Sequence, residues 1–167
     1  DIAYLRSLNT FDEDFLNYLA DFRFSGDIYA IPEGTVVFPR EPLVKVVAPI
    51  MEAQLVETAI LTIINHQSLI ATKASRVVCA AKGDGIMEFG LRRAQGPDAG
   101  VYGARAAMIG GCIGTSNVLA GQLFDVPVKG THAHSWIMSF PDEYTAFKTY
   151  ANMYPLSLIY ISEPTRP

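Results

Sequence analysis

The sequence predicts an α/β fold, in which a small β-rich segment leads into the first βα units of a parallel sheet or barrel. Three observations support this prediction: short apolar segments between proline- and glycine-containing turns, one long helical pattern, and then strand-like and helix-like segments in alternation. Half of the 167 residues are hydrophobic and 18% are charged, which is typical of a globular domain with a sizeable core. With the β-rich segment included, the chain is expected to be α+β.

Residues 1–48 are predicted to be the C-terminal part of a β-rich N-terminal domain. Apolar residues at three- and four-residue spacing predict a helix over 12–24. Short strands are expected over 28–31, 35–38 and 43–47, because turn sequences containing proline separate them. Residues 49–84 follow as a long connecting helix region, which ends near Ala81 with Gly83 as the stop signal.

Residues 85–155 are predicted to begin an α/β barrel with three βα units. The expected strands are 86–89, 110–113 and 126–129. The helices after them are expected over 100–108, up to 124, and over 142–153. In folds of this kind the chemistry lies in loops after the carboxyl ends of the strands, and three unusual motifs fall in those loops.

Both ends of the sequence are expected to be artificial boundaries. The chain begins with Asp1 rather than Met, so an upstream segment is expected to be missing. Residues 156–167 abandon the alternating pattern and closely resemble the translation of a transposase-type sequencing adapter. We predict that they are a non-native tail and exclude them from the fold.

The composition excludes several classes of function. A net charge of −4 gives no general attraction to nucleic acid or to an anionic membrane, so positive charge for a phosphate substrate has to be local. The longest apolar segment, residues 53–71, is interrupted by polar side chains, which argues against a membrane helix. Cys79 and Cys112 lack metal-ligand spacing, which favours buried free thiols and a reducing cytoplasm.

The first motif is EFGLRRAQG, residues 88–96. The ring of Phe89 offers a stacking platform for a flat ligand, and the guanidiniums of Arg92 and Arg93 suit a carboxylate or phosphate. A regular strand would direct Phe89 and Arg92 to opposite faces, so a shared site needs a bend, which Gly90 can supply. The alternative is a core phenylalanine beside a solvated turn.

The second motif is GGCIGTSN, residues 110–117. Glycines before a helix let a ligand approach closely, and the first N–H groups of the helix suit an anion. The alternative is that Thr115 or Ser116 only caps the helix. The spacing matches neither a Walker loop nor a dinucleotide-binding fingerprint.

The third motif is GTHAHSW, residues 130–136, and two functional interpretations compete for it. His132 and His134 can hold a catalytic metal, as in metal-dependent hydrolases, or one of them can act as a nucleophile or acid–base group beside a phosphate. A metal would need further ligands, and the chain's only other histidine, His66, falls in the long helix. A purely structural histidine pair is the third alternative.

Taken together and in this order, the segments EFGLRRAQGPDAG, GTSNVLAGQLFDVPVKGT and AHSW resemble the nicotinate phosphoribosyltransferase family, with similarity from about residue 5 to residue 155. The resemblance implies a type II phosphoribosyltransferase fold, with a β-rich N-terminal domain and an irregular α/β barrel. It implies a cytoplasmic enzyme of NAD biosynthesis, a homodimer when full length. The enzyme forms nicotinate mononucleotide and pyrophosphate from nicotinate and phosphoribosyl pyrophosphate, with ATP as co-substrate and Mg²⁺ on the pyrophosphate.

The resemblance also implies how the substrates are held. Phe89 would stack on the pyridine ring. Arg92, with Arg93, would balance the charge of the nicotinate carboxylate or of the phosphoribosyl group. Ser116 and Thr131 would position phosphate or carboxylate oxygens by hydrogen bonding.

His134 is the catalytic residue that the resemblance implies, transiently phosphorylated by ATP. A neutral imidazole is nucleophilic near neutral pH, and the phosphoramidate that it forms is labile. Ser135 bears on substrate choice, because the related nicotinamide enzymes carry an acid in this stretch. An acid would repel the carboxylate of nicotinate, whereas a serine hydroxyl can donate to it, so the sequence favours nicotinate over nicotinamide.

Two other functions stay open: a metal-dependent barrel hydrolase that uses His132 and His134, and a non-catalytic fragment that binds a phosphate. The family's N-terminal tyrosine, which closes the ring site from the partner subunit, would lie upstream of Asp1, and the later barrel strands would lie beyond residue 155. A barrel does not close with three strands. We therefore expect the chain, made as written, to be inactive and to aggregate.

Overall fold

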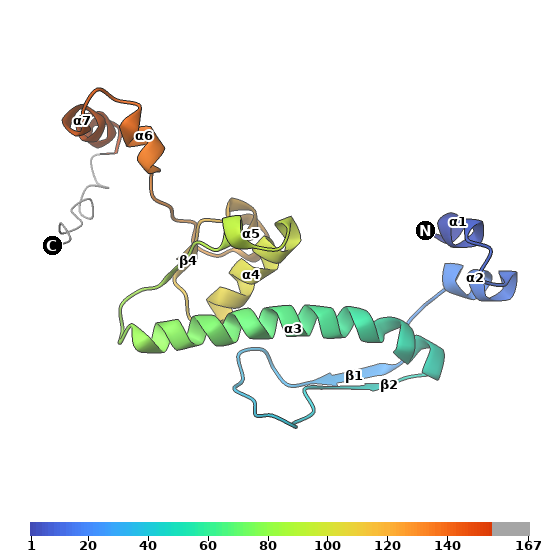
Figure 1. The fold of residues 1–167 in the computed structure, drawn as a ribbon. Helices are drawn as coiled ribbons and strands as arrows, with labels where there is room; N and C mark the ends of the chain where they lie inside the picture. Colours follow the sequence, from blue (N-terminus) through green and yellow to red (C-terminus); the bar gives the residue numbers. More distant parts are fainter. Residues whose placement is uncertain (155–167) are drawn as a thin grey trace. The chain divides into compact units, whose positions relative to one another are not determined.

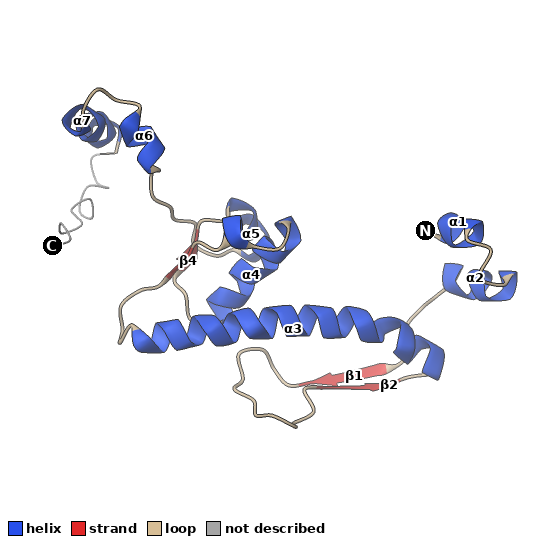
Figure 2. Ribbon diagram, in the orientation of Figure 1, coloured by secondary structure: helices blue, strands red, loops and turns tan. Residues whose placement is uncertain are grey.

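The computed structural model describes residues 1–154, so the predicted non-native tail lies outside the described residues (Figure 1). The chain divides into two compact units, Asp1–Val128 and a second that begins at Lys129. Helices and strands are mixed, which confirms the predicted α/β class, although strands occupy little of the chain (Figure 2). The predicted domain boundaries, after residues 48, 84 and 155, stay predictions.

The first unit begins with two short helices, α1 (Ile2–Ser7) and α2 (Glu13–Ala20), which pack against each other. Asp12 caps α2 by accepting a hydrogen bond from the amide of Phe15 at 2.8 Å, and Leu16 is buried. The predicted helix over 12–24 is therefore present, but it ends at Ala20.

A two-stranded antiparallel hairpin follows, made of β1 (Asp27–Ala30) and β2 (Val44–Val47). The strand predicted over 35–38 is wrong, because its backbone groups are used in turns. The amide of Thr35 donates to the carbonyl oxygen of Pro32 at 3.3 Å, and the amide of Phe38 donates to the Glu41 carboxylate at 2.9 Å. The connection between β1 and β2 is therefore a long loop rather than a strand.

The predicted long helix is confirmed as α3 (Ile50–Ala80), which has 31 residues. The β1–β2 hairpin and the later helix α4 (Pro97–Ile109) lie on different sides of α3 (Figure 1). At the start of α3, the buried Glu52 accepts hydrogen bonds from the amide and hydroxyl of Ser25, at 2.7 and 2.9 Å. These bonds tie the first turn of α3 to the segment that precedes β1.

The third and fourth strands, β3 (Met87–Glu88) and β4 (Gly114–Thr115), pair in parallel, and Thr115 makes a further parallel bridge to Val128. The predicted parallel arrangement is therefore confirmed for the first two strands, whereas the strand predicted over 126–129 is only a single bridge at Val128. The strand predicted over 110–113 is displaced, because Gly110 ends α4, Gly111 turns with a φ of +101°, and the amide of Cys112 donates to the carbonyl oxygen of Ala107. The strand that follows joins α4 to α5 (Val118–Phe124).

Helix α4 packs against α3 and α5 through small side chains. Val101, Ala104 and Ala120 form a buried cluster, with Phe124 packed against it. At the end of α4, a Cβ placed on Gly110 would stand 2.7 Å from both the carbonyl oxygen of Ala71 and the Cβ of Ala74, on α3. The two helices therefore approach too closely at this point for any larger residue.

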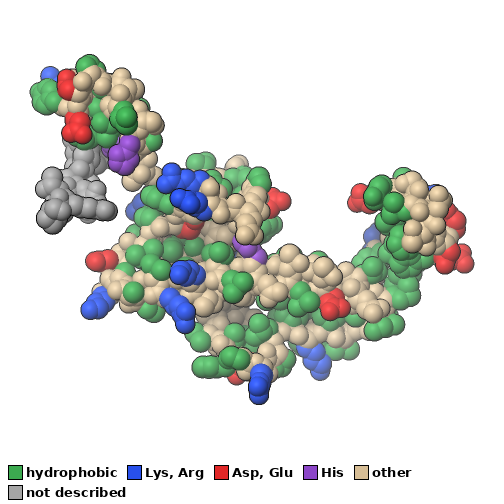
Figure 3. Space-filling model, in the orientation of Figure 1, with side chains coloured by type: hydrophobic (Ala, Val, Ile, Leu, Met, Phe, Trp, Pro, Cys, Tyr) green, Lys and Arg blue, Asp and Glu red, His purple; other side chains and the backbone are tan. Residues whose placement is uncertain are grey.

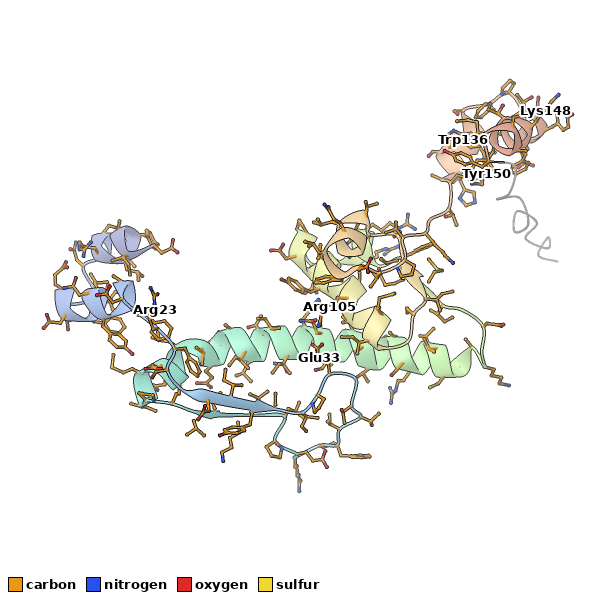
Figure 4. The ribbon with its side chains drawn as sticks, turned by 180° about the vertical axis from the view of Figure 1, so that it is seen from behind. Arg23, Glu33, Arg105, Trp136, Lys148 and Tyr150 are labelled. Carbon is orange, nitrogen blue, oxygen red and sulfur yellow. The ribbon has the colours of Figure 1, made fainter. Side chains whose placement is uncertain are left out.

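Arg105 links α4 to the β1–β2 loop and to α3 (Figure 4). Its guanidinium donates to both carboxylate oxygens of Glu33, at 2.9 and 2.6 Å, and to the Gln67 side chain at 2.9 Å. It also lies 5.7 Å from the ring centroid of Phe124, on α5. The hydrogen bonds and charge of Arg105 lower the pKa of Glu33, so this carboxyl stays ionised as the partner of the guanidinium.

The second unit contains α6 (His134–Met138) and α7 (Glu143–Met153), the latter as predicted. Asp142 caps α7 by accepting from the amide of Thr145 at 2.7 Å. Aromatic rings of the two helices and of the preceding segment pack edge-on or tilted, with Trp136 and Tyr150 among them. Across residues 1–154, no helix combines the length and the apolar character that crossing a membrane requires.

Candidate functional site

The first two motifs meet at one edge of the parallel strand pair. Phe89 directly follows β3, and Ser116 directly follows β4. The carboxyl ends of parallel strands lie at the same edge of a sheet. The backbone amide of Ser116 donates to the backbone carbonyl oxygen of Glu88 at 3.1 Å, which joins the two motifs at this edge.

The bend that a shared site requires is present immediately after Phe89. Gly90 is helical, with φ −80° and ψ −9°, and it starts a 3-10 turn, η1 (Leu91–Arg93). The amide of Arg93 donates back to the carbonyl oxygen of Gly90 at 2.8 Å. The chain therefore leaves the strand direction at Gly90, so the alternating directions of a strand do not apply to Phe89 and Arg92.

Phe89, Arg92 and Arg93 are accessible to a ligand. Phe89 is 43% exposed, so the alternative of a core phenylalanine is wrong. Both arginines are exposed, and neither forms an ion pair with another residue in the part of the chain that the structure describes. Guanidiniums in this state retain their full set of donors for a carboxylate or phosphate.

A hydrogen-bonded network lies beneath this edge, and its central residue is Glu88. The Glu88 carboxylate accepts from the hydroxyl of Thr115 at 2.6 Å and from the amide of Gly90. The hydroxyl oxygen of Thr115 in turn accepts from the amide of Asn117 at 3.0 Å. Thr115 is fully buried and Asn117 is 3% exposed, so the network is part of the interior.

The helix cap expected at Thr115 or Ser116 belongs instead to Asn117. The side-chain oxygen of Asn117 accepts from the amide of Ala120 at 3.1 Å, at the start of α5. The organising roles of Glu88 and Asn117 were not predicted from the sequence. The available signals were an asparagine immediately before an apolar helical segment, and a carboxylate at a strand end two residues before a glycine.

The two cysteines differ from each other. Cys79 is exposed, so the prediction that both thiols are buried is wrong for this residue, which lies on the outer side of α3 near its end. Cys112 is partly buried, and burial together with the negative charge of Glu88 raises the pKa of its thiol. Cys112 is therefore protonated near neutral pH and a poor nucleophile.

The third motif lies in the second compact unit. Thr131, His134 and Ser135 are exposed there, and His134 is the first residue of α6. His132 is only partly exposed, and its ring centroid lies 4.9 Å from that of Tyr150 and 5.6 Å from that of Trp136. A structural role therefore suits His132, whereas His134 presents its imidazole to solvent.

A protein-bound metal does not fit the residues of this motif. Among residues 1–154, no three His, Cys, Asp or Glu side chains are grouped so that they could hold a metal ion. The hydrolase alternative, which needs such a group around His132 and His134, has no support from this geometry.

A groove of about 600 Å³ lies elsewhere in the first unit, between the hairpin and α3. Its walls are mostly apolar side chains, among them Val44, Val46, Ile60 and Ile64, and Glu57 is its one acidic side chain. None of the predicted site residues lines it. Its chemistry suits packing against another apolar surface rather than binding of a phosphate.

Comparison with known protein families gives two successive matches. Residues 1–65 match the nicotinate phosphoribosyltransferase (NAPRTase) N-terminal domain, and residues 85–154 match the nicotinate phosphoribosyltransferase (NAPRTase) family. The second match contains all three motifs.

Individual relatives agree with these matches. The chain is 48% identical over 161 residues to nicotinate phosphoribosyltransferase pncB2 of Mycobacterium tuberculosis (strain ATCC 25618 / H37Rv). The matched region covers 96% of this chain and 35% of that protein. It is 50% identical over 151 residues to nicotinate phosphoribosyltransferase of Bacillus subtilis (strain 168), with 90% and 31% covered. The chain thus spans about a third of the length of these curated relatives.

Two solved structures are similar as well. Human nicotinic acid phosphoribosyltransferase superposes with a TM-score of 0.76 and 41% identity, over 84% of this chain and 29% of that one. Nicotinate-nucleotide pyrophosphorylase from Pyrococcus furiosus superposes with a TM-score of 0.72 and 35% identity, over 76% and 32%. The sequence and structure comparisons therefore agree, and the chain belongs to the nicotinate phosphoribosyltransferase family.

Proposed function

We propose that the full-length protein containing this chain joins nicotinate to phosphoribosyl pyrophosphate, forming nicotinate mononucleotide and pyrophosphate in NAD biosynthesis. The observation that carries the proposal is the family membership, with identities of 48% and 50% to two nicotinate phosphoribosyltransferases. The chain covers only about a third of those relatives, so the activity is that of the longer protein. Within it, residues 1–154 supply part of the substrate site.

The transfer joins the pyridine nitrogen of nicotinate to the anomeric carbon of the ribose, while the bond from that carbon to pyrophosphate breaks. In our proposal the exposed ring of Phe89 stacks on the pyridine. Arg92, with Arg93, balances the nicotinate carboxylate or the phosphoribosyl charge. The exposure of all three side chains and the bend at Gly90 support this assignment.

Hydroxyl groups would complete the binding of the anionic groups. Ser116, at the carboxyl end of β4, and Thr131, in the third motif, would donate to phosphate or carboxylate oxygens. Ser135 would donate to the nicotinate carboxylate, where an acid would repel it. Exposure of the Thr131 and Ser135 side chains supports their role as ligand contacts.

His134 is the residue that we assign to ATP. Its imidazole nitrogen would attack the γ-phosphorus, so that a P–N bond forms while the P–O bond to ADP breaks and the imidazole releases a proton to solvent. Its exposure in α6, in contrast to the packed ring of His132, supports the choice between the two histidines. Mg²⁺ would accompany the phosphates of ATP and pyrophosphate and screen their charge.

The remaining proposals concern the setting of the enzyme. We propose that the full-length protein is a cytoplasmic homodimer, with nicotinate, phosphoribosyl pyrophosphate and ATP as its partners. The chain's net charge of −4 supports the expectation that neither nucleic acid nor a membrane surface is a partner.

The test uses the full-length protein, assayed with phosphoribosyl pyrophosphate and either nicotinate or nicotinamide, with and without ATP. The variants are His134→Ala and, as a matched control, His132→Ala. We expect the wild type to prefer nicotinate and to be stimulated by ATP. His134→Ala should lose the stimulation and the acid-labile label from γ-labelled ATP, whereas His132→Ala should keep the label.

The other outcomes reject different parts of the proposal. Absence of nicotinate turnover in the wild type rejects the proposed reaction. Turnover with an unlabelled wild type rejects the phosphohistidine but keeps the transferase. Stoichiometric zinc in the purified protein, lost in both histidine variants, would favour the metal-dependent hydrolase.

A further inference from the structure

We propose that Glu88 is a positioning residue for the substrate site, acting through its hydrogen bonds and not through its charge. The inference rests on the proposed function, because the loop that Glu88 holds carries Phe89 and Arg92. Glu88 itself ends β3 and is partly buried. Its role would be to fix that loop relative to the carboxyl end of β4.

The contacts of Glu88 span both strands of the parallel pair. Its carboxylate accepts from the Thr115 hydroxyl, on β4, at 2.6 Å, and from the amide of Gly90, in its own loop. Its backbone carbonyl oxygen accepts from the amide of Ser116 at 3.1 Å. One residue thus connects the turn that carries Phe89 with the segment that carries Ser116.

Thr115 extends the hydrogen-bonded network from Glu88 to the start of α5. Its hydroxyl donates its proton to Glu88 and accepts from the amide of Asn117, and Asn117 caps α5. The hydroxyl has a fixed donor and a fixed acceptor, so its orientation is determined. Because Thr115 is fully buried, water cannot replace a partner that is removed.

Gly90 leaves room for this carboxylate next to its own backbone amide. A Cβ on Gly90 would stand 2.7 Å from Oε1 of Glu88. The backbone of Gly90 is helical, with a φ of −80°, so its conformation alone would accept any residue. A side chain here would meet only the flexible end of Glu88, which would have to shift away from the Gly90 amide.

The test measures nicotinate kinetics of the full-length protein for Glu88→Ala, Glu88→Gln and Gly90→Ala. Glu88→Ala should raise KM for nicotinate on the order of tenfold with a smaller effect on kcat, since it loosens the groups that bind ground state and transition state alike. Glu88→Gln should restore part of the loss, because its oxygen can accept from the Gly90 amide, whereas its nitrogen cannot accept the proton of the Thr115 hydroxyl. Gly90→Ala should raise KM in the same direction but by less, because the end of the Glu88 side chain can shift to admit the new Cβ.

The control is Glu143→Ala, an exposed glutamate on α7, which should leave KM unchanged. A wild type without nicotinate turnover overturns both the proposed function and this inference. With an active wild type, a KM that Glu88→Ala leaves unchanged overturns the inference alone, even when the melting temperature falls. So does a Glu88→Gln variant as impaired as Glu88→Ala, because the hydrogen bond from the Gly90 amide, which glutamine keeps, would then have no effect on the site.

Discussion

At the scale of single residues, carboxylates that accept a hydrogen bond from a backbone amide recur along the chain. Glu52 accepts from Ser25, Glu88 from Gly90, and Asp142 from Thr145. Each of these bonds pairs a backbone donor with a side-chain acceptor and so fixes the local chain direction. At Glu88 and Asp142 the carboxylate joins the end of a strand or helix to the neighbouring residues, and at Glu52 it joins the start of α3 to the segment before β1.

The cap at Asp142 predicts a pH dependence for α7. Hydrogen bonds from the amide and hydroxyl of Thr145 lower the pKa of Asp142 below its usual 3.8. Because the folded pKa is depressed, the stabilisation is fully present above about pH 3.8 and is lost as the pH falls through the folded value. Hydrogen exchange of α7 peptides, corrected for the intrinsic rate, should therefore accelerate on acidification.

The matched variant is Asp142→Asn, which can cap the helix equally well but does not titrate. Its α7 protection should be independent of pH over the same acidic range. If the wild type and the asparagine variant lose protection in parallel, another group controls the acid sensitivity of α7.

The residues of the site were predictable to different degrees. Phe89 and Arg92, with a bend at Gly90, follow from local sequence, because an aromatic, a glycine and paired arginines stand together. The role of Glu88 does not, since its partner Thr115 lies on another strand and the pairing is set by tertiary structure. The prediction that Cys79 is buried was wrong, because apolar neighbours in the sequence do not show which side of a helix a residue occupies.

At the scale of elements, the long helices and the two hairpin strands were predictable, and the short parallel strands after residue 84 were predictable only in part. Helix α3 has 31 residues of sustained periodicity, and α7 begins at a clear aspartate cap, so both were predicted nearly to their ends. Each parallel strand is only two residues long, which is too short for the alternation of apolar and polar residues that identifies a strand in a sequence. Their positions are set by pairing with each other, and that is why the strand before α5 was displaced.

The crossing of α3 and α4 yields a prediction about stability. Gly110→Ala would bring a Cβ to 2.7 Å from backbone and side-chain atoms of α3, and rigid helices cannot easily move apart. We expect a loss of about 1–3 kcal/mol in the free energy of unfolding, measured by urea denaturation of the full-length protein. Gly130→Ala is the matched control, since no atom lies within 4 Å of its new Cβ. Equal stability of the two variants would contradict the close approach of α3 and α4 at Gly110.

At the scale of the whole molecule, many large apolar side chains are exposed. On α3 alone, Ile50 and Leu69 are each 71% exposed, Ile63 is 57% exposed and Leu61 is 51% exposed. Figure 3 shows hydrophobic side chains spread over the face in view. A stable monomer rarely leaves this much apolar surface in water, and a further covering surface is needed.

We therefore predict that the 167-residue chain, produced alone, aggregates at micromolar concentration and has no nicotinate turnover. The measurement is size-exclusion chromatography with light scattering, together with binding of a dye that reports exposed apolar surface. The full-length protein is the control and should be monodisperse under the same conditions. A soluble, monodisperse 167-residue chain that turns over nicotinate would contradict the prediction.

The bridge between Arg105 and Glu33 also has a consequence for the order in which the chain folds. The two residues are 72 positions apart, so the bridge closes a long loop, whereas the hydrogen bonds of each helix close only short ones. Contacts between distant residues form slowly, because the entropy of closing the loop is lost before the contact is gained. During synthesis the loop around Glu33 therefore cannot form its bridge to Arg105 until α4 has emerged from the ribosome.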